Sequence, residues 1–170
     1  MGHRRMKFFQ HGVLAAVVVL MAACGGGGED APVRGALVEV PSTAGTLTVA
    51  QIDAGPLKAL TGPAKCDVKL ISLNYYTIGP KGEQTNASAA MFVPVASASC
   101  PTTAQPLLAY APERDAQKSR TLANLADPET FLIAAVYAAQ GYVVVSTDYL
   151  GYAKSSFPYH PYLHADSEAS

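Results

Sequence analysis

The segment that follows the apolar run YVVVST (residues 142–147) gathers several side chains that could do chemistry. It begins at Asp148 and reads DYLGYAKSSFPYHPYLHADSEAS. Imidazole and carboxylate groups bind divalent metals and transfer protons, and the segment contains both kinds, at His160, His164, Asp166 and Glu168. Pro161 interrupts any helix that would align the two histidines. We therefore expect packing and loop hydrogen bonds at these residues, with no metal and no cofactor.

The elements that precede this segment predict an α/β fold. From Cys66 the sequence alternates with period two over CDVKLISLNYYTIG, turns at PKGEQT, and continues over NASAAMFVPV, which predicts an antiparallel hairpin. PLLAYA is a short apolar run flanked by prolines and predicts a buried strand. Upstream, TLTVAQIDAGPLKAL predicts one short helix with a capping box at Thr48 and Gln51, broken at Gly55 and Pro56.

A helix with strong boundary signals follows in DPETFLIAAVYAAQG. Asp127 is a suitable N-cap, Pro128 suits the first helical position, and Gly141 suits the left-handed position after the end. Leu132, Ala135, Val136 and Ala139 share one face at helical spacing. The continuous run YVVVST then predicts a strand covered on both faces. Strand, helix and strand in this order imply a right-handed crossover between two parallel strands, so the hairpin leads into a parallel sheet.

Composition limits the class of protein. The 170 residues carry a formal net charge of −1, with 49% hydrophobic and 15% charged residues. This is enough apolar material for one core, and there is no basic patch, so we expect no nucleic-acid partner.

The N-terminus has the features of an export signal. Residues 1–23 combine a basic start with an apolar run. The sequence LMAAC (residues 20–24) stands at the end of this run, and GGGG follows. This pattern resembles a bacterial lipobox, in which Cys24 is acylated and becomes the mature N-terminus. The alternative is an ordinary secretory signal with an unrelated cysteine nearby. We expect a lipid-anchored protein of the cell envelope, at the outer membrane, with a flexible tether at residues 24–35 and a domain at residues 36–170.

Two cysteines remain after Cys24. Export places Cys66 and Cys100 in an oxidising compartment, where an even pair predicts a disulfide. The alternative is a pair of buried free thiols.

Several stretches together carry a family resemblance, from about Arg34 onward. LTGPAKCDVKL, GPKGE, TLANLADPET and the segment from Gly141 to Ser170 are similar to bacterial secretory lipase/esterase-like proteins of the α/β-hydrolase superfamily. The resemblance implies the N-terminal part of an α/β-hydrolase sheet, up to the helix before the nucleophile strand. It also implies a Ser, His and acid triad, whose Ser lies in a G-x-S-x-G turn.

The printed sequence contains no G-x-S-x-G, and both His160 and His164 precede the place where that turn would come. We therefore expect a fragment of a carboxylic-ester hydrolase that is inactive as given, with an ester or lipid substrate only if the chain were completed. The alternative is a noncatalytic, lipid-anchored surface lipoprotein that binds a partner or an apolar ligand. We also expect an unpaired strand edge along residues 142–147, through which the chain could self-associate.

The resemblance assigns roles to four further positions. Relatives carry a His-Gly-type stretch where this chain reads YAPERDAQ, so Glu113 and Arg114 are candidates for the oxyanion region. The preceding Pro112 has no N–H to donate there, and the Glu113 carboxylate would oppose a developing negative charge. Asp148 is expected to be structural in the turn after its strand. Tyr149 and Tyr152 could line an acyl pocket or cover the sheet edge.

Overall fold

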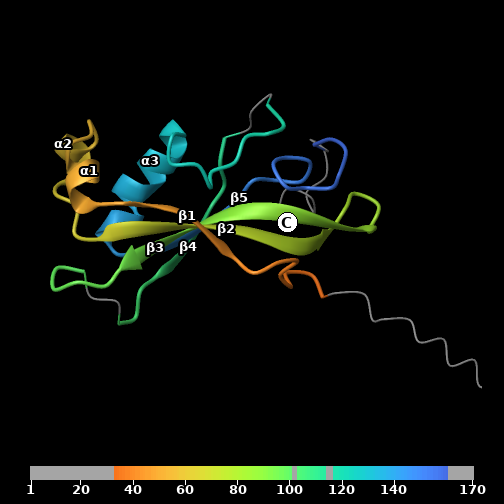
Figure 1. Ribbon diagram of the computed structural model, residues 1–170, viewed down its shortest axis with the longest axis horizontal. Helices are drawn as coiled ribbons and strands as arrows, with labels where there is room; N and C mark the ends of the chain where they lie inside the picture. The colour runs from red at the N-terminus through yellow and green to blue at the C-terminus, as the bar shows by residue number, and fades with distance from the viewer. Residues whose placement is uncertain (1–32, 101–102, 114–116, 161–170) are drawn as a thin grey trace, which may run out of the picture. The chain divides into compact units, whose positions relative to one another are not determined.

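The computed structural model describes residues 33–100, 103–113 and 117–160. They form a five-stranded sheet in the order β1-β2-β3-β5-β4, and helices α1, α2 and α3 lie over one face of it (Figure 1). The predicted signal segment, Cys24, most of the tether and residues 161–170 lie outside the described part of the chain. Within that part, no helix is both long enough and apolar enough to cross a membrane.

The N-terminal elements differ from the predicted single broken helix. Thr48 and Gln51 do form a capping box at the start of α1 (Val49–Asp53), and the helix ends before Gly55 as predicted. A second short helix, α2 (Lys58–Thr61), follows the break. Strand β1 (Ser42–Leu47) was not predicted, because its small residues show no clear alternation; pairing with β2 and a bulge between Thr43 and Gly45 define it.

The predicted hairpin is confirmed. Strands β2 (Asp67–Ile78) and β3 (Gln84–Val95) pair antiparallel along their whole length, from Asp67 opposite Val95 to Ile78 opposite Gln84. Gly82 adopts a φ of 77° in the connecting turn, a conformation that favours glycine. The hairpin supplies the central strands of the sheet.

The predicted crossover is also confirmed. Strand β4 (Leu107–Tyr110) leads to α3 (Pro128–Val136), then to the 3₁₀ turn η1 (Ala138–Gln140), and β5 (Val143–Thr147) returns parallel to β4. The Asp127 side chain accepts hydrogen bonds from the backbone N–H groups of Glu129 and Thr130, as an N-cap should. Gly141 has the predicted left-handed conformation, with a φ of 106°.

The face of α3 that the spacing groups together, with Leu132, Ala135, Val136 and Ala139, is only partly buried. Leu132 is 37% exposed, whereas Thr130, Ile133 and Ala134 are buried together with Ala135. The helix gives way to a 3₁₀ turn after Val136, and the tighter turn brings Ala138 and Ala139 into the core as well. The buried stripe therefore runs from Thr130 through Ile133 and Ala134 to Ala138.

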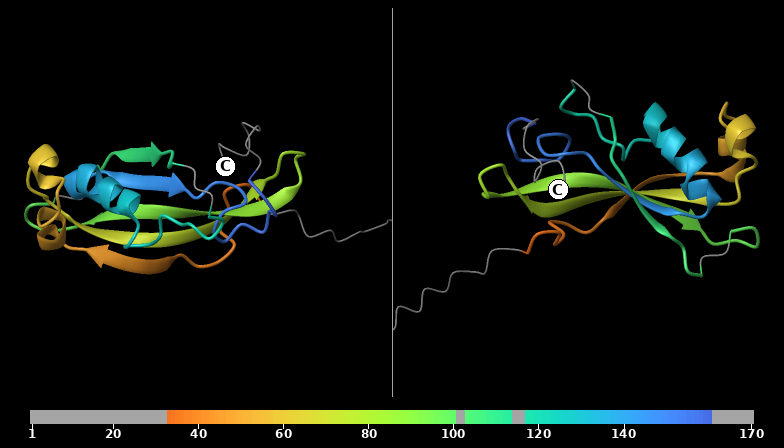
Figure 2. Two further views of the ribbon diagram at one scale, coloured as in Figure 1. Left: turned by 90° about the horizontal axis from the view of Figure 1, so that it is seen from above. Right: turned by 180° about the vertical axis from the view of Figure 1, so that it is seen from behind.

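The predicted open edge along residues 142–147 is wrong. Strand β5 pairs with β3 on one side and with β4 on the other, because the crossover inserts β5 between them. Among the described strands, β1 and β4 lie at the two edges of the sheet, and the view from above shows β4 outside β5 (Figure 2). The sequence also predicted that β5 is covered on both faces, and only one face is fully buried. Val144 and Ser146 lie on the buried face, whereas Val145 and Thr147 on the other face are half-buried.

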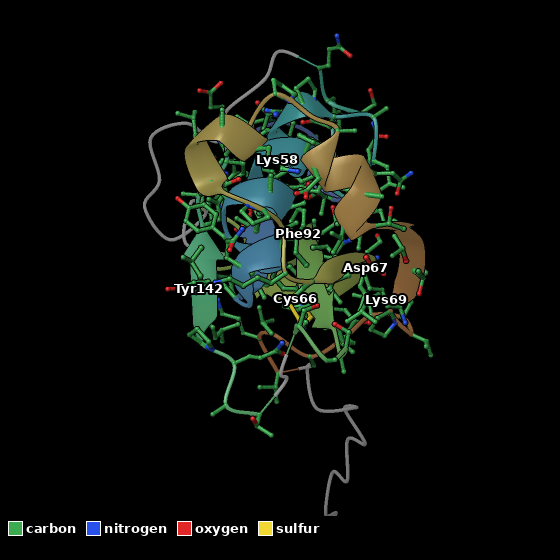
Figure 3. The ribbon with its side chains drawn as sticks, turned by 90° about the vertical axis from the view of Figure 1, so that its left-hand side faces the viewer. Lys58, Cys66, Asp67, Lys69, Phe92 and Tyr142 are labelled. Carbon is green, nitrogen blue, oxygen red and sulfur yellow. A yellow bond between two sulfur atoms is a disulfide. The ribbon has the colours of Figure 1, made fainter. Side chains whose placement is uncertain are left out.

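The core lies between the sheet and the helices. Phe92, labelled in Figure 3, is fully buried and belongs to one apolar cluster with Leu70, Ile133 and Val144. The predicted disulfide is confirmed: Cys66 and Cys100 are bonded, with their Cα atoms 5.0 Å apart. This bond ties the start of β2 to the loop before β4, and it fits a protein exported to an oxidising compartment.

Candidate functional site

The candidate site is built from the loops that follow β4 and β5. Ligands of open α/β sheets bind at the carboxyl ends of the parallel strands, and both loops leave that end on the same side of the molecule (Figures 1 and 2). The N–H of Ala153 donates a 2.7 Å hydrogen bond to the carbonyl of Lys118, which fastens one loop to the other.

Asp148 is the polar centre of this junction. Its buried carboxylate accepts hydrogen bonds from the hydroxyls of Ser88 and Thr121, at 2.6 and 2.9 Å, and from the N–H of Leu122, at 2.9 Å. Burial raises the pKa of the Asp148 carboxyl, and these three donors oppose that shift. Both carboxylate oxygens of Asp148 therefore accept hydrogen bonds from the protein itself, which fits the structural role expected for Asp148.

Tyr149 and Tyr152 lie in a tight reversal of the chain after Asp148. Tyr149 and Gly151 adopt left-handed φ values of 61° and 87°. Both tyrosines are buried, and their ring centroids lie 5.7 and 5.1 Å from that of His160. The Tyr149 hydroxyl donates to the carbonyl of Pro112 at 3.0 Å. This hydrogen bond holds the loop after β4 in place. Both rings also border a cleft of about 20 Å³, which has room for roughly one water molecule.

In the expected oxyanion region, the backbone N–H of Glu113 already has a hydrogen-bond acceptor within the chain. The N–H of Glu113 donates to Oε1 of Glu129 at 3.0 Å, and the Tyr110 hydroxyl donates to the same oxygen at 2.9 Å. Pro112 contributes no donor, and Arg114 lies outside the described residues. The N–H of Glu113, one of the two residues expected in the oxyanion region, therefore already binds a carboxylate.

Arg120 holds this arrangement together, although the sequence analysis did not identify it as a site residue. Its guanidinium pairs with Asp127 at 3.1 Å and with Glu129, and also donates to the carbonyl of Glu113 at 2.7 Å. Hydrogen bonds to Asp127 and Glu129 raise the pKa of Arg120 and keep it charged. Burial, with the carboxylate of Glu129 as a further cause, raises the pKa of Tyr110 to about 12. The one sequence feature that could have indicated an ion pair was Glu129 in the first turn of a capped helix. Nothing in the sequence placed Arg120 beside it.

His160 contacts the rings of Tyr149 and Tyr152 and the backbone of Leu150. Its Nδ1 lies 2.8 Å from the carbonyl of Leu150. His164, Asp166 and Glu168, the other candidates for metal ligands, lie outside the described part of the chain. Within residues 33–100, 103–113 and 117–160, no group of three or more His, Cys, Asp or Glu side chains could hold a metal ion.

An apolar groove of about 470 Å³ lies on the sheet near the same loops. Side chains alternate between the two faces of a strand. Val145 and Ala89 line the groove, whereas their neighbours Val144 and Ala90 belong to the core under α3. The groove is therefore on the face turned away from α3. The residues that border it are Gly35, Leu37, Leu73, Tyr75, Ala89, Ala109, Tyr110, Ala111, Val145, Thr147 and Tyr149.

Comparisons with known proteins identify the fold. No family model matches the chain, and no curated protein matches it in sequence. Among solved structures, the rice cell wall degrading esterase LipA from Xanthomonas oryzae is 36% identical, with a TM-score of 0.71 over 82% of this chain. Its ligand-bound form is 37% identical with the same TM-score. A Legionella pneumophila protein described as a hydrolase is 23% identical, with a TM-score of 0.64 over 76% of this chain.

The match covers only part of these proteins. This chain spans 35% of the length of LipA and 34% of the Legionella protein. The fold is that of part of an α/β-hydrolase, and the chain is similar to bacterial lipase/esterase-like proteins of this superfamily.

Proposed function

We propose that residues 36–170 form part of a carboxylic-ester hydrolase of the lipase/esterase type, supplying half of its sheet and the wall of its substrate site. The observation that carries this proposal is the similarity to an esterase in both sequence and fold over most of this chain. The carboxyl ends of β4 and β5, with the loops that contain Glu113 and Tyr149, provide the surface on which such a site would be built.

We further propose that the 170-residue chain by itself does not hydrolyse esters. Acyl transfer needs a Ser oxygen activated by a His, beside N–H groups that stabilise the oxyanion. The printed sequence has no G-x-S-x-G turn. In addition, the Glu113 N–H is engaged by Glu129, and two carboxylates at this position would oppose a developing negative charge. The expected rate with short-chain nitrophenyl esters is that of buffer. Saturable hydrolysis that copurifies with the chain and is blocked by a serine-directed phosphonate would contradict this.

A chimera tests the scaffold role directly. The segment of Xanthomonas LipA that this chain matches would be replaced by the corresponding residues from this protein. If the shared fold supports the same kind of site, the chimera should hydrolyse nitrophenyl esters and be labelled by the phosphonate. The matched control carries the same replacement with the nucleophilic serine changed to alanine. A folded chimera that neither hydrolyses the ester nor reacts with the phosphonate would count against the proposal.

We also propose that Cys24 is acylated and anchors the protein in the cell envelope, at the outer membrane. The sequence LMAAC before a Gly-rich tether supports this, and the Cys66–Cys100 disulfide fits export. Intact mass after detergent extraction should show a lipid-modified chain that begins at Cys24, and Cys24→Ser should release the protein from membranes. An unmodified N-terminus at another residue would refute the anchor.

A second candidate function is a noncatalytic lipoprotein that binds an apolar ligand. The groove favours it, because its volume suits a small ligand and most of its bordering residues are apolar. Displacement of a fluorescent fatty acid should then be saturable. Val145→Arg, in the groove, should abolish binding, whereas Val40→Arg should not, since Val40 is 88% exposed and does not border the groove. Equal binding by the two variants would exclude this use of the groove.

A further inference from the structure

The backbone just after β4 is held by side chains from three different parts of the chain. The carbonyl of Pro112 accepts a hydrogen bond from the hydroxyl of Tyr149, in the loop after β5, at 3.0 Å. The N–H of Glu113 donates to Glu129, in the first turn of α3, and the carbonyl of Glu113 accepts from Arg120. Three successive backbone groups of an irregular segment therefore bind the protein itself, which gives this segment one defined position.

Arg120 and Glu129 act on Glu113 as a pair. One carboxylate oxygen of Glu129 accepts from the Glu113 N–H at 3.0 Å, and the other pairs with the Arg120 guanidinium, which donates to the Glu113 carbonyl at 2.7 Å. These contacts form a closed ring. Asp127 binds the Nε of Arg120 at 3.1 Å, and the Tyr110 hydroxyl binds Glu129 at 2.9 Å, so both members of the pair are oriented in turn. Neither backbone group of Glu113 can turn away unless the ion pair opens.

Stability alone does not account for this ion pair. The side chains of Arg120 and Glu129 are 19% and 11% exposed. Moving such charges out of water costs about as much free energy as their attraction returns, and well-packed apolar residues often stabilise a protein equally well. The planar guanidinium differs from an apolar side chain in its geometry, because it binds several acceptors in fixed directions. Its specific effect here is on the orientation of the backbone at Glu113.

We propose that Arg120 is a positioning residue of the hydrolase site, which acts through Glu129 and the backbone of residues 112–113. This inference rests on the proposed function, since it takes the carboxyl end of β4 as part of the substrate site. Groups that bind a transition state must be held in place before the reaction, and a displacement of about 1 Å can lower the rate strongly. The pair sets the direction in which the chain leaves β4, although Arg120 itself touches no reacting atom.

Amide hydrogen exchange of the full chain in detergent tests this positioning without any need for activity. In the wild type, the N–H of Glu113 should exchange at least about tenfold more slowly than a free loop amide, because it has a fixed acceptor. Arg120→Lys should remove most of this protection, since lysine keeps the charge but lacks the planar fork. The N–H of Leu122 donates to Asp148 at 2.9 Å in the same loop and should keep its rate in this variant.

Thr121→Val is the matched control. The Thr121 hydroxyl donates to Asp148 and not to the ion pair, so this variant should leave exchange at Glu113 unchanged even where exchange at Leu122 becomes faster. A general loosening of the loop would instead speed exchange at both amides in both variants. The inference is overturned if the wild-type Glu113 amide exchanges like a free amide, or if Arg120→Lys either leaves it protected or speeds both amides equally.

The effect on the reaction is measured in the chimera with Xanthomonas LipA. Arg120→Lys should lower kcat of the chimera about tenfold and change KM less than about twofold, because a displaced segment loses transition-state stabilisation rather than substrate binding. An unchanged kcat would overturn the positioning role in the reaction. A chimera that is inactive before this substitution would count against the proposed function instead, and the exchange rates of the chain would still decide whether Arg120 positions Glu113.

Discussion

The hydroxyl of Ser88, on β3, donates a 2.6 Å hydrogen bond to the carboxylate of Asp148, just after β5. The same carboxylate binds Thr121 and Leu122, which belong to the loop after β4. One buried charge thus connects the centre of the sheet with both loops of the candidate site. Removing it should affect the stability of the site more than any exposed carboxylate does.

The contribution of Asp148 to the free energy of unfolding should change with pH in the opposite direction to that of most acidic groups. Burial raises its folded-state pKa above the ordinary value of 3.8, so the folded state holds the proton more tightly than the unfolded state does. Its contribution to stability is then largest below pH 3.8 and is lost as pH rises through the folded pKa. The free energy of unfolding of the wild type relative to Asp148→Asn should therefore fall as pH rises over this window.

Urea unfolding at several pH values, followed by circular dichroism because the chain has no tryptophan, measures this difference. Glu39→Gln is the control, since Glu39 is exposed and pairs with Lys154 on the surface. A difference between wild type and Asp148→Asn that grows with pH would show that hydrogen bonds, rather than burial, dominate at this site.

Arg120→Met should destabilise the fold by about 2 to 3 kcal/mol, because it leaves two half-buried carboxylates without their cation. The Arg120 side chain is 19% exposed and those of Asp127 and Glu129 are each 11% exposed. Lys58→Met is the matched control: it breaks the ion pair with Asp53, in which the lysine is 49% exposed, and should cost less than about 1 kcal/mol. Equal losses in urea unfolding would mean that Arg120 is held no more tightly than a surface residue.

The disulfide should stabilise the fold by restricting the unfolded chain. It joins residues 34 positions apart, and a loop of this length corresponds to about 3 to 4 kcal/mol on the chain-entropy model. The double variant Cys66→Ala and Cys100→Ala should lose this amount, and unreduced, unfolded wild type should show neither thiol to a labelling reagent. Labelling of both cysteines would contradict the bridge.

Local signals predicted much of this fold because they act over a few residues. The capped helix at Asp127, the left-handed Gly141 and the hairpin of β2 and β3 each depend on neighbouring side chains and backbone preferences. Strand β1 was missed because its small residues gain their conformation from pairing with β2.

The remaining errors concern contacts between residues that are distant in the sequence. The strand order β3-β5-β4 depends on how the crossover packs, so the open edge was assigned to β5 instead of β4. Arg120 and Glu129 are nine residues apart with a turn between them, and only the folded loop brings their charges together. Sequence spacing alone therefore located the loops of the site but not the ion pairs that hold them.

Gly151→Ala should disrupt the loop after β5 more than its backbone conformation alone explains. Gly151 has a φ of 87°, and a Cβ there would lie 2.3 Å from the carbonyl oxygen of Tyr159 and 2.6 Å from the N of His160. These are backbone atoms, so the segment that carries His160 must move. We expect a loss of roughly 3 kcal/mol, of which about 1 kcal/mol reflects the left-handed conformation and the rest the displaced packing.

Gly82→Ala separates the two contributions. Gly82 has a φ of 77° but no atom within 4 Å of an added Cβ, so this variant should lose only the conformational part, about 1 kcal/mol. Urea unfolding gives both losses, and proton chemical shifts of the His160 ring report whether it still contacts Tyr149 and Tyr152. Equal losses, with the His160 signals unchanged in Gly151→Ala, would show that the loop yields without cost and that Gly151 does not position the site.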